Sequence, residues 1–174
     1  IALLRLEKAF DEDGIIKKIN AISDVLEKSE EGVALIRSVR AEMAALSKKP
    51  QAPAPSVLFI LSMNGQAVMA AGRETAADAA ITLAGGTNLF AAFEGYKSVS
   101  PEALFATPPD AIVIMGNTVA RMGGLDPVVT HSALQASPAV KNDQVIVVDG
   151  MALLGFGPRT PAAIAKLRAE LFEQ

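Results

Sequence analysis

The sequence predicts an α/β fold, a three-layer, Rossmann-like lobe with a central, mostly parallel sheet, preceded by a long helix. One observation behind this prediction is a set of short, largely apolar runs that alternate with segments of helical spacing, at 57–61, 111–115 and 144–148. Strands buried on both faces form such runs, and their alternation with helices is typical of a covered parallel sheet. The other observation is composition, since 51% of the residues are hydrophobic and 20% are charged, which is enough for a core.

Two helices are predicted before the first strand. Residues 15–26 place their apolar side chains on one helical stripe, and the carboxylates at 11–13 favour a helix N-terminus there. A second helix is predicted over 30–48, ended by the pair of lysines at 48–49, with an apolar stripe made of Ile36, Val39, Met43 and Leu46. We expect both stripes to pack against neighbouring elements.

A proline-rich break separates these helices from the rest of the chain. Pro53 and Pro55 disfavour a helix and favour an extended connection, so a linker is predicted over 49–56. The following α/β region, 57–174, is expected to contain a short strand at 66–71 and helices over 75–84, from 100 and over 161–171. Ligands bind beyond the carboxyl ends of parallel strands, which points to the loops 62–65, 116–124 and 149–159.

Several classes of function are disfavoured. The net charge is −3 and no Lys/Arg block exceeds two residues, so no nucleic-acid partner is expected. The absence of Cys excludes disulfides and thiolate metal sites, and no apolar run approaches the length of a membrane span. Residues 155–160 resemble a phosphate-binding loop but lack its Lys. His131, the single His, lies in a loop-like run and is predicted to be at the surface. This single His gives no evidence for a hydrolytic triad and is too few for a catalytic zinc site.

Three residues stand out as candidates, and two of them have two interpretations. Arg159, within a rigid Gly/Pro-rich turn, either pairs with a surface carboxylate or points into a cleft toward an anion. Met63, after the first strand, either fills the core or ligates a soft metal or heme iron. Tyr96 is by default a half-buried structural side chain.

Three blocks of sequence resemble the haemin (heme)-binding periplasmic proteins of bacterial ABC importers. The first two blocks cover 57–104: Val57–Ser62, Ala70–Asp78 and Leu83–Asn88, then Phe93–Leu104. The third and most specific block is 148–161, which reads VDGMALLGFGPRTP. The segment Leu83–Asn88 by itself also resembles the wider group of siderophore and cobalamin binders.

The resemblance implies two α/β lobes joined by a rigid helix, with heme held between them. On that basis 1–29 would be the end of the N-terminal lobe with a first helix, 30–48 the connecting helix, and 57–174 the C-terminal lobe. The rest of the N-terminal lobe, which in this family supplies a tyrosine ligand to the iron, would be missing. Tyr96 lies in a motif of the C-terminal lobe and is not that ligand. The chain begins at Ile1 without Met or signal peptide, so we expect a processed or trimmed product.

The resemblance also implies roles for individual residues. Arg159 matches an arginine facing the heme cleft, where Tyr96 and Asn64 are also expected. Met63 stands where some members have a His axial ligand, so it becomes a possible iron ligand. Glu102 matches a surface glutamate that binds arginines of the inner-membrane permease. The expected function is heme binding and delivery to that permease from the periplasm, with no enzymatic activity. The alternatives are a binding protein for cobalamin or a ferric siderophore, and a Rossmann-like domain of a larger enzyme.

Overall fold

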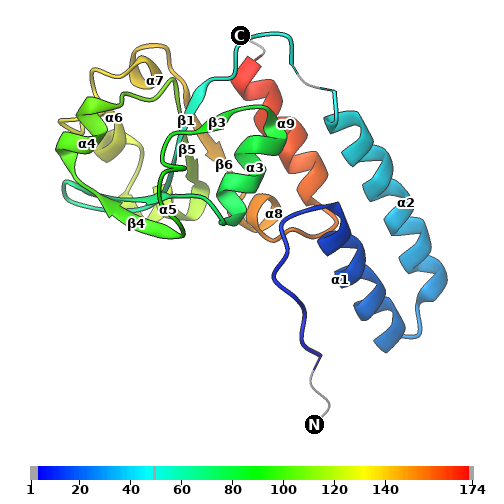
Figure 1. Cartoon of the computed structure of the whole chain (residues 1–174). Coiled ribbons are helices and arrows are strands. Elements are labelled where there is room, and N and C mark those ends of the chain that lie inside the picture. The colour runs from blue at the N-terminus through cyan, green and yellow to red at the C-terminus, as the bar shows by residue number, and fades with distance from the viewer. Residues whose placement is uncertain (1–3, 49, 173–174) are drawn as a thin grey trace.

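The computed structural model describes residues 4–48 and 50–172, and its elements follow the predicted order (Figure 1). The predicted segments 1–29, 49–56 and 57–174 therefore lack residues 1–3, 49 and 173–174, and the prediction for Lys49 lies outside the described residues. The helices are α1 Glu12–Val25, α2 Ser29–Leu46, α3 Ala76–Ala84, α4 Pro101–Ala106, α5 Gly116–Met122, α6 Asp126–Val129, α7 Pro138–Lys141, α8 Gly150–Leu154 and α9 Thr160–Phe172. The strands are β1 Ser56–Asn64, β2 Ala67–Ala71, β3 Thr87–Asn88, β4 Tyr96–Val99, β5 Ala111–Met115 and β6 Val145–Val148.

The sheet has the order β4-β2-β1-β5-β6, with β3 paired to the start of β1. β5 lies parallel to both β1 and β6, and β3 is also parallel to β1. β2 is antiparallel to β1 and to β4. The mostly parallel sheet of the sequence prediction is confirmed, with an antiparallel hairpin added at one side.

Alternate residues of the central strands enter two separate cores, which makes the lobe three-layered. Val57 and Phe59 of β1 face a core shared with α1, α2, α3, α8 and α9. Leu58 and Ile60 face the second core, to which the segments of α4 to α7 contribute. This alternation follows from the two-residue period of a strand. Figure 1 shows the first group of helices on one side of the sheet and the second group on the other.

The two N-terminal helices form an antiparallel pair that packs on the lobe through α9. Asp11 caps α1 by accepting a hydrogen bond from the backbone N–H of Gly14 at 2.7 Å. Val39, Met43 and Leu46 of the predicted stripe are buried. The helices approach closely at Gly32, where an added Cβ would lie 2.5 Å from the Ser23 hydroxyl oxygen. No helix within the described ranges is long and apolar enough to cross a bilayer.

Three predicted loops contain regular structure instead. Residues 62–64 belong to β1 and not to a loop, because their backbone groups pair with β2. The loops at 116–124 and 149–159 contain α5 and α8. α8 begins at the cap Asp149, whose carboxylate accepts hydrogen bonds from Met151 N at 2.9 Å and Ala152 N at 3.1 Å. This Asx-type cap lies within the specific sequence block, where a helix of five residues is too short to show a periodic pattern.

Candidate functional site

A hollow of about 480 Å³ lies beside the edge strand β6, next to α9. It is lined by Arg159, the residue that the sequence analysis proposed as a cation facing a cleft. Its floor is apolar, formed by side chains of β6, α8 and α9. Charged residues surround it: Glu42 of α2, Lys166 and Glu170 of α9, the cap residue Asp149, and Arg159 of the turn. The lining residues are Glu42, Ile146, Val147, Val148, Asp149, Ala152, Leu153, Pro158, Arg159, Ala162, Ala163, Lys166, Leu167 and Glu170. An apolar floor with a few charged groups at its rim is typical of a small-molecule site.

The turn that carries Arg159 is held firmly by its neighbours. Lys18 of α1 donates hydrogen bonds to the carbonyl oxygens of Gly155 at 3.2 Å and Phe156 at 3.0 Å. Phe156 is fully buried against Phe10, with ring centroids 5.3 Å apart, and has a left-handed φ of +43°. A left-handed backbone is costly for a bulky residue, so burial and the Lys18 contacts must offset it. Thr160 accepts a hydrogen bond from Gly157 N at 3.0 Å and closes the turn.

Arg159 itself is exposed at the mouth of the hollow. None of the four ion pairs among the described residues involves its guanidinium. The interpretation as a surface ion pair therefore has no partner in the described part of the chain. Lys166 lines the same hollow, and sequence reasoning did not single it out. Arg159 directly precedes α9, and Lys166 follows it by seven residues, about two helical turns; this spacing is the signal that could have placed the two side chains on the same side of the chain.

Met63 and Asn64 lie in the β1–β2 hairpin, opposite Val68 and Ala67. Met63 is half-buried against the core beneath α4 to α7, while Asn64 is exposed at the end of the strand. This packing favours the core-filling interpretation of the Met63 thioether.

His131 contacts the turn of that hairpin at Gln66. It is buried, with only 2% of its surface exposed. The prediction of a surface histidine is therefore wrong. Its Nδ1 accepts a hydrogen bond from Ala133 N at 3.2 Å, so Nε2 carries the proton and donates to the carbonyl oxygen of Gln66 at 3.3 Å. Ser132 donates to the side-chain oxygen of Gln66 at 2.7 Å. His131 and Gln66 lie 65 residues apart, so no local pattern showed the contact.

Tyr96 begins β4 and pairs with Ala71, on the α3 side of the sheet. Burial raises the pKa of its phenol above the ordinary value of 10.0, while hydrogen bonds with Thr75 and the backbone of Ala77 act in the opposite direction. Tyr96 is 36% exposed, so it lies at the surface with only part of its ring covered.

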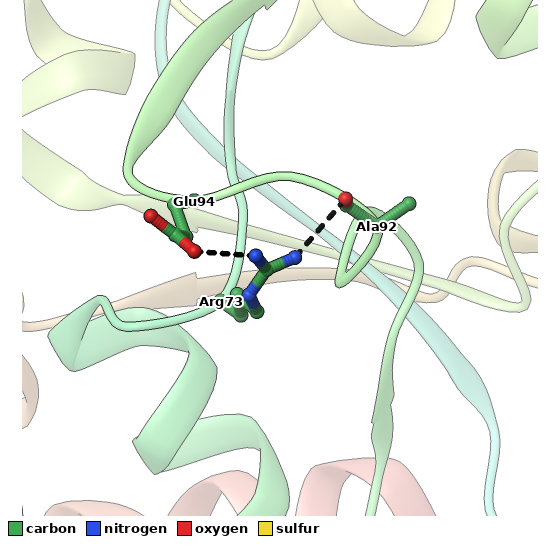
Figure 2. A network of polar contacts seen from close by, with 3 residues as sticks. All are labelled: Arg73, Ala92 and Glu94. Carbon is green, nitrogen blue, oxygen red and sulfur yellow. Dashed lines mark hydrogen bonds and ion pairs between the residues drawn. The ribbon is translucent and has the colours of Figure 1, made fainter.

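A network of polar contacts fixes the chain just before Tyr96 (Figure 2). The guanidinium of Arg73 donates to the carbonyl oxygen of Ala92 at 3.1 Å and pairs with the carboxylate of Glu94. The backbone adds a hydrogen bond from Gly72 N to Gly95 O at 2.7 Å. These contacts hold the start of β4 against the start of α3.

The four residues predicted in the heme cleft do not form one cluster in this lobe. Met63 packs on the α4–α7 side of the sheet, whereas Tyr96 contacts α3 on the other side. The strand register separates them by three residues of β2, about 10 Å along the strand. Arg159 lines the hollow beside β6, at the opposite edge of the sheet from β4. The described residues contain no group of three or more His, Asp or Glu side chains that could hold a metal ion.

Glu102 lies on a different surface, in the first turn of α4, and is exposed. Hydrogen bonds from its own backbone N–H and from Ser100 lower the pKa of its carboxyl group. The side chain is therefore ionised at neutral pH and available to a cation on a partner.

The fold and its hollow define a ligand-binding lobe of the α/β class, and comparison with known proteins identifies the family. Residues 3–152 match the family described as "Periplasmic binding protein", and the chain belongs to that family. This is a family of substrate-binding proteins of transport systems and not of enzymes, which confirms the expectation that the chain is a binding module. It also removes the enzyme-domain alternative. The comparison with curated proteins gives no significant match.

Three solved structures show the likeness in detail. The periplasmic heme-binding protein BhuT, solved with two hemes, is 34% identical with a TM-score of 0.85, over 94% of this chain and 63% of its own. RhuT, a periplasmic heme-binding protein from Roseiflexus sp. RS-1, is 32% identical with a TM-score of 0.85, over 94% and 64%. HutB, a periplasmic heme-binding protein of Vibrio cholerae, is 28% identical with a TM-score of 0.81, over 93% and 64%.

The chain spans less than two thirds of the length of these relatives. An Fe³⁺-hydroxamate transport protein from Saccharomonospora viridis also shares the fold, with 23% identity and a TM-score of 0.74. The resemblance seen in the sequence is thus confirmed at the level of the family and the fold.

Proposed function

We propose that this chain is the C-terminal lobe of a periplasmic protein that binds heme and delivers it to the permease of an ABC importer. The observation that carries the proposal is the likeness to heme-binding proteins, which reaches 34% identity and a TM-score of 0.85 over 94% of the chain. In this proposal an N-terminal lobe outside the given sequence would close the cleft and supply the tyrosine ligand that the sequence resemblance implies. The connecting helix between the lobes would be α2.

Arg159 is the residue of this lobe that we propose for the heme cleft. It stands at the carboxyl end of β6, next to an apolar floor, with no ion-pair partner among the described residues. A guanidinium there suits a propionate or an ionised phenol of the other lobe. Tyr96 and Asn64 would lie at the rim of the cleft. Met63, packed on the other side of the sheet, is proposed to support the hairpin rather than to ligate iron.

The experiment is a visible absorption spectrum of the full-length protein, as purified and during titration with haemin. A Soret band that saturates at one or two hemes per protein supports the proposal. Parallel titrations with cobalamin and with a ferric hydroxamate test the alternative ligands. Tight binding of either alternative, with no Soret change on addition of haemin, would refute a role in heme transport.

The isolated chain is expected to bind haemin weakly, because it lacks the second half of the cleft. For the isolated chain we expect a dissociation constant above about 1 μM, which corresponds to a binding free energy weaker than about −8 kcal/mol. Tighter, stoichiometric binding by this chain would mean that the ligand site lies wholly within this lobe.

A further inference from the structure

The aromatic side chain of Phe105 is 71% exposed on α4, although the short helix around it is well fixed. Leu104, the preceding residue, is fully buried in the core beneath α4 to α7. The hydroxyl of Ser100 accepts a hydrogen bond from Ala103 N at 3.3 Å, and Thr107 donates to the carbonyl oxygen of Ala103 at 2.9 Å. Phe105 is therefore presented to solvent by a helix held at both ends.

Phe105 and Glu102 stand on the rim of the same surface hollow. They are three residues apart on α4, the spacing that places two side chains on one helical face. The hollow has a volume of about 300 Å³ and is lined by Pro101, Glu102, Phe105, Ser132 and Ala133. The hollow is shallow and open to solvent, so a side chain of a partner could lie in it beside the Phe105 ring.

The far wall of the hollow is rigid as well. Ala133 donates its backbone N–H to the buried His131, and the Ser132 hydroxyl is bonded to Gln66 of the β1–β2 hairpin. A preorganised surface loses little conformational entropy when it is covered, which favours association. Large aromatic side chains are enriched among the residues that dominate binding energy at protein interfaces.

We propose that Phe105 is the apolar anchor of the permease-docking surface, beside the carboxylate of Glu102. The proposal rests on the proposed function, in which this lobe docks on an importer's permease. The partner surface would carry a basic side chain opposite Glu102 and an apolar socket for the Phe105 ring. Glu102 forms none of the four ion pairs among the described residues, so its charge is available to that basic side chain.

The test measures docking and ligand binding separately. Full-length wild type, Phe105→Ala and Glu102→Gln are compared for haemin affinity and for binding to the permease–ATPase complex in lipid nanodiscs. Phe105→Ala is expected to weaken docking at least tenfold, with unchanged haemin affinity and melting temperature. Val33→Ala, which trims another exposed apolar side chain on α2, is the matched control and should dock normally.

Each remaining outcome overturns a defined part of the reasoning. Normal docking by Phe105→Ala with weakened docking by Glu102→Gln would refute the anchor and leave the proposed function in place. Loss of haemin affinity in Phe105→Ala would show that the ring serves the ligand or the fold and would refute the anchor too. A dimer of the wild type that Phe105→Ala dissociates would assign the surface to a second copy of the chain. Failure of the wild type to bind any permease complex would refute the proposed function itself.

Discussion

Replacing the half-buried Arg168 by methionine should destabilise the lobe strongly, because its guanidinium donates to four carbonyl oxygens at the ends of two helices. Nη2 lies 2.6 Å from Leu46 O and 2.6 Å from Leu83 O, Nη1 lies 2.9 Å from Lys48 O, and Nε lies 3.1 Å from Ala84 O. The arginine thus joins α9 to the C-terminal ends of α2 and α3.

The last turn of α3 shows why these bonds matter. The final four carbonyls of a helix have no partner within it. In α3 the carbonyls of Ile81 and Thr82 accept hydrogen bonds from Gly86 N and Gly85 N, where Gly85 has a left-handed φ of +97°. The carbonyls of Leu83 and Ala84 are the remaining two, and Arg168 satisfies both. Without the guanidinium, these part-buried oxygens lose their only protein donor among the described residues.

The expected loss is worked from these contacts. A hydrogen bond to a charged group contributes about 1.5–3 kcal/mol, but bonds from one guanidinium are not additive and water replaces the exposed ones. We therefore expect Arg168→Met to lower the free energy of unfolding by about 3 kcal/mol. For a chain of this size that corresponds to a decrease in melting temperature of about 6–12 °C. Methionine keeps the apolar stem, so the variant isolates the donors.

Urea and thermal unfolding of the chain, followed by circular dichroism, measure the effect. Lys166→Ala on the same helix is the control, since an exposed surface substitution should change stability by no more than about 0.5 kcal/mol. Arg168→Lys should fall between the two, because one ammonium group lacks the planar fork of donors. Equal stability of Arg168→Met and the control would refute the assignment of Arg168 as a bridge between helix ends.

Three further predictions concern the cleft, the helix pair and the single tyrosine. Arg159→Ala in the full-length protein should weaken haemin binding about tenfold to a hundredfold, the loss of a charge-assisted hydrogen bond of roughly 1.5–3 kcal/mol, as measured at the Soret band. Gly32→Ala should destabilise the chain by about 1–3 kcal/mol, since the new Cβ would lie 2.5 Å from the Ser23 hydroxyl oxygen; urea unfolding measures this. Tyr96 should ionise above its ordinary pKa of 10.0 in an ultraviolet titration, and stability should fall as the pH rises through that region, because the unfolded chain releases the phenol proton first.

Controls separate these effects from general disturbance. Arg37→Ala removes another exposed arginine, from α2, and should leave haemin affinity unchanged. A large decrease in melting temperature for Arg159→Ala would assign that residue a structural role instead. Ser23→Gly should restore stability to Gly32→Ala, and a failure to do so would contradict the steric explanation. A phenol that titrates in the folded chain as it does in urea would contradict the burial of Tyr96.

The fold was predictable wherever a local signal determines the structure. α3 follows from Thr75, whose hydroxyl caps the helix, and from the left-handed Gly85 that ends it. The apolar runs became β1, β5 and β6 because strands buried on both faces need no alternation. Residues 62–64 escaped prediction, since only pairing with β2 distinguishes an extended hairpin from a loop.

The site was less predictable because its contacts join distant parts of the chain. Arg168 reaches carbonyls 84 to 122 residues away, and His131 reaches Gln66 across 65 residues. No pattern of spacing contains such information. The Gly/Pro-rich turn around Arg159 was recognised by its composition, but its contacts with Lys18 of α1 required the folded structure.

The contacts between α1 and the turn of Arg159 determine which elements form one rigid body with the lobe. α1 precedes the proline-rich linker in sequence, yet Lys18 and Phe10 attach it to the turn that presents Arg159. α1 and α2 pack on each other, and α2 packs on α9, so the pair is carried along with the lobe. The proline-rich linker therefore does not separate two independently packed units, because α1, α2 and the turn with Arg159 form one body with the lobe. A movement of the lobe would carry α1, α2 and Arg159 with it.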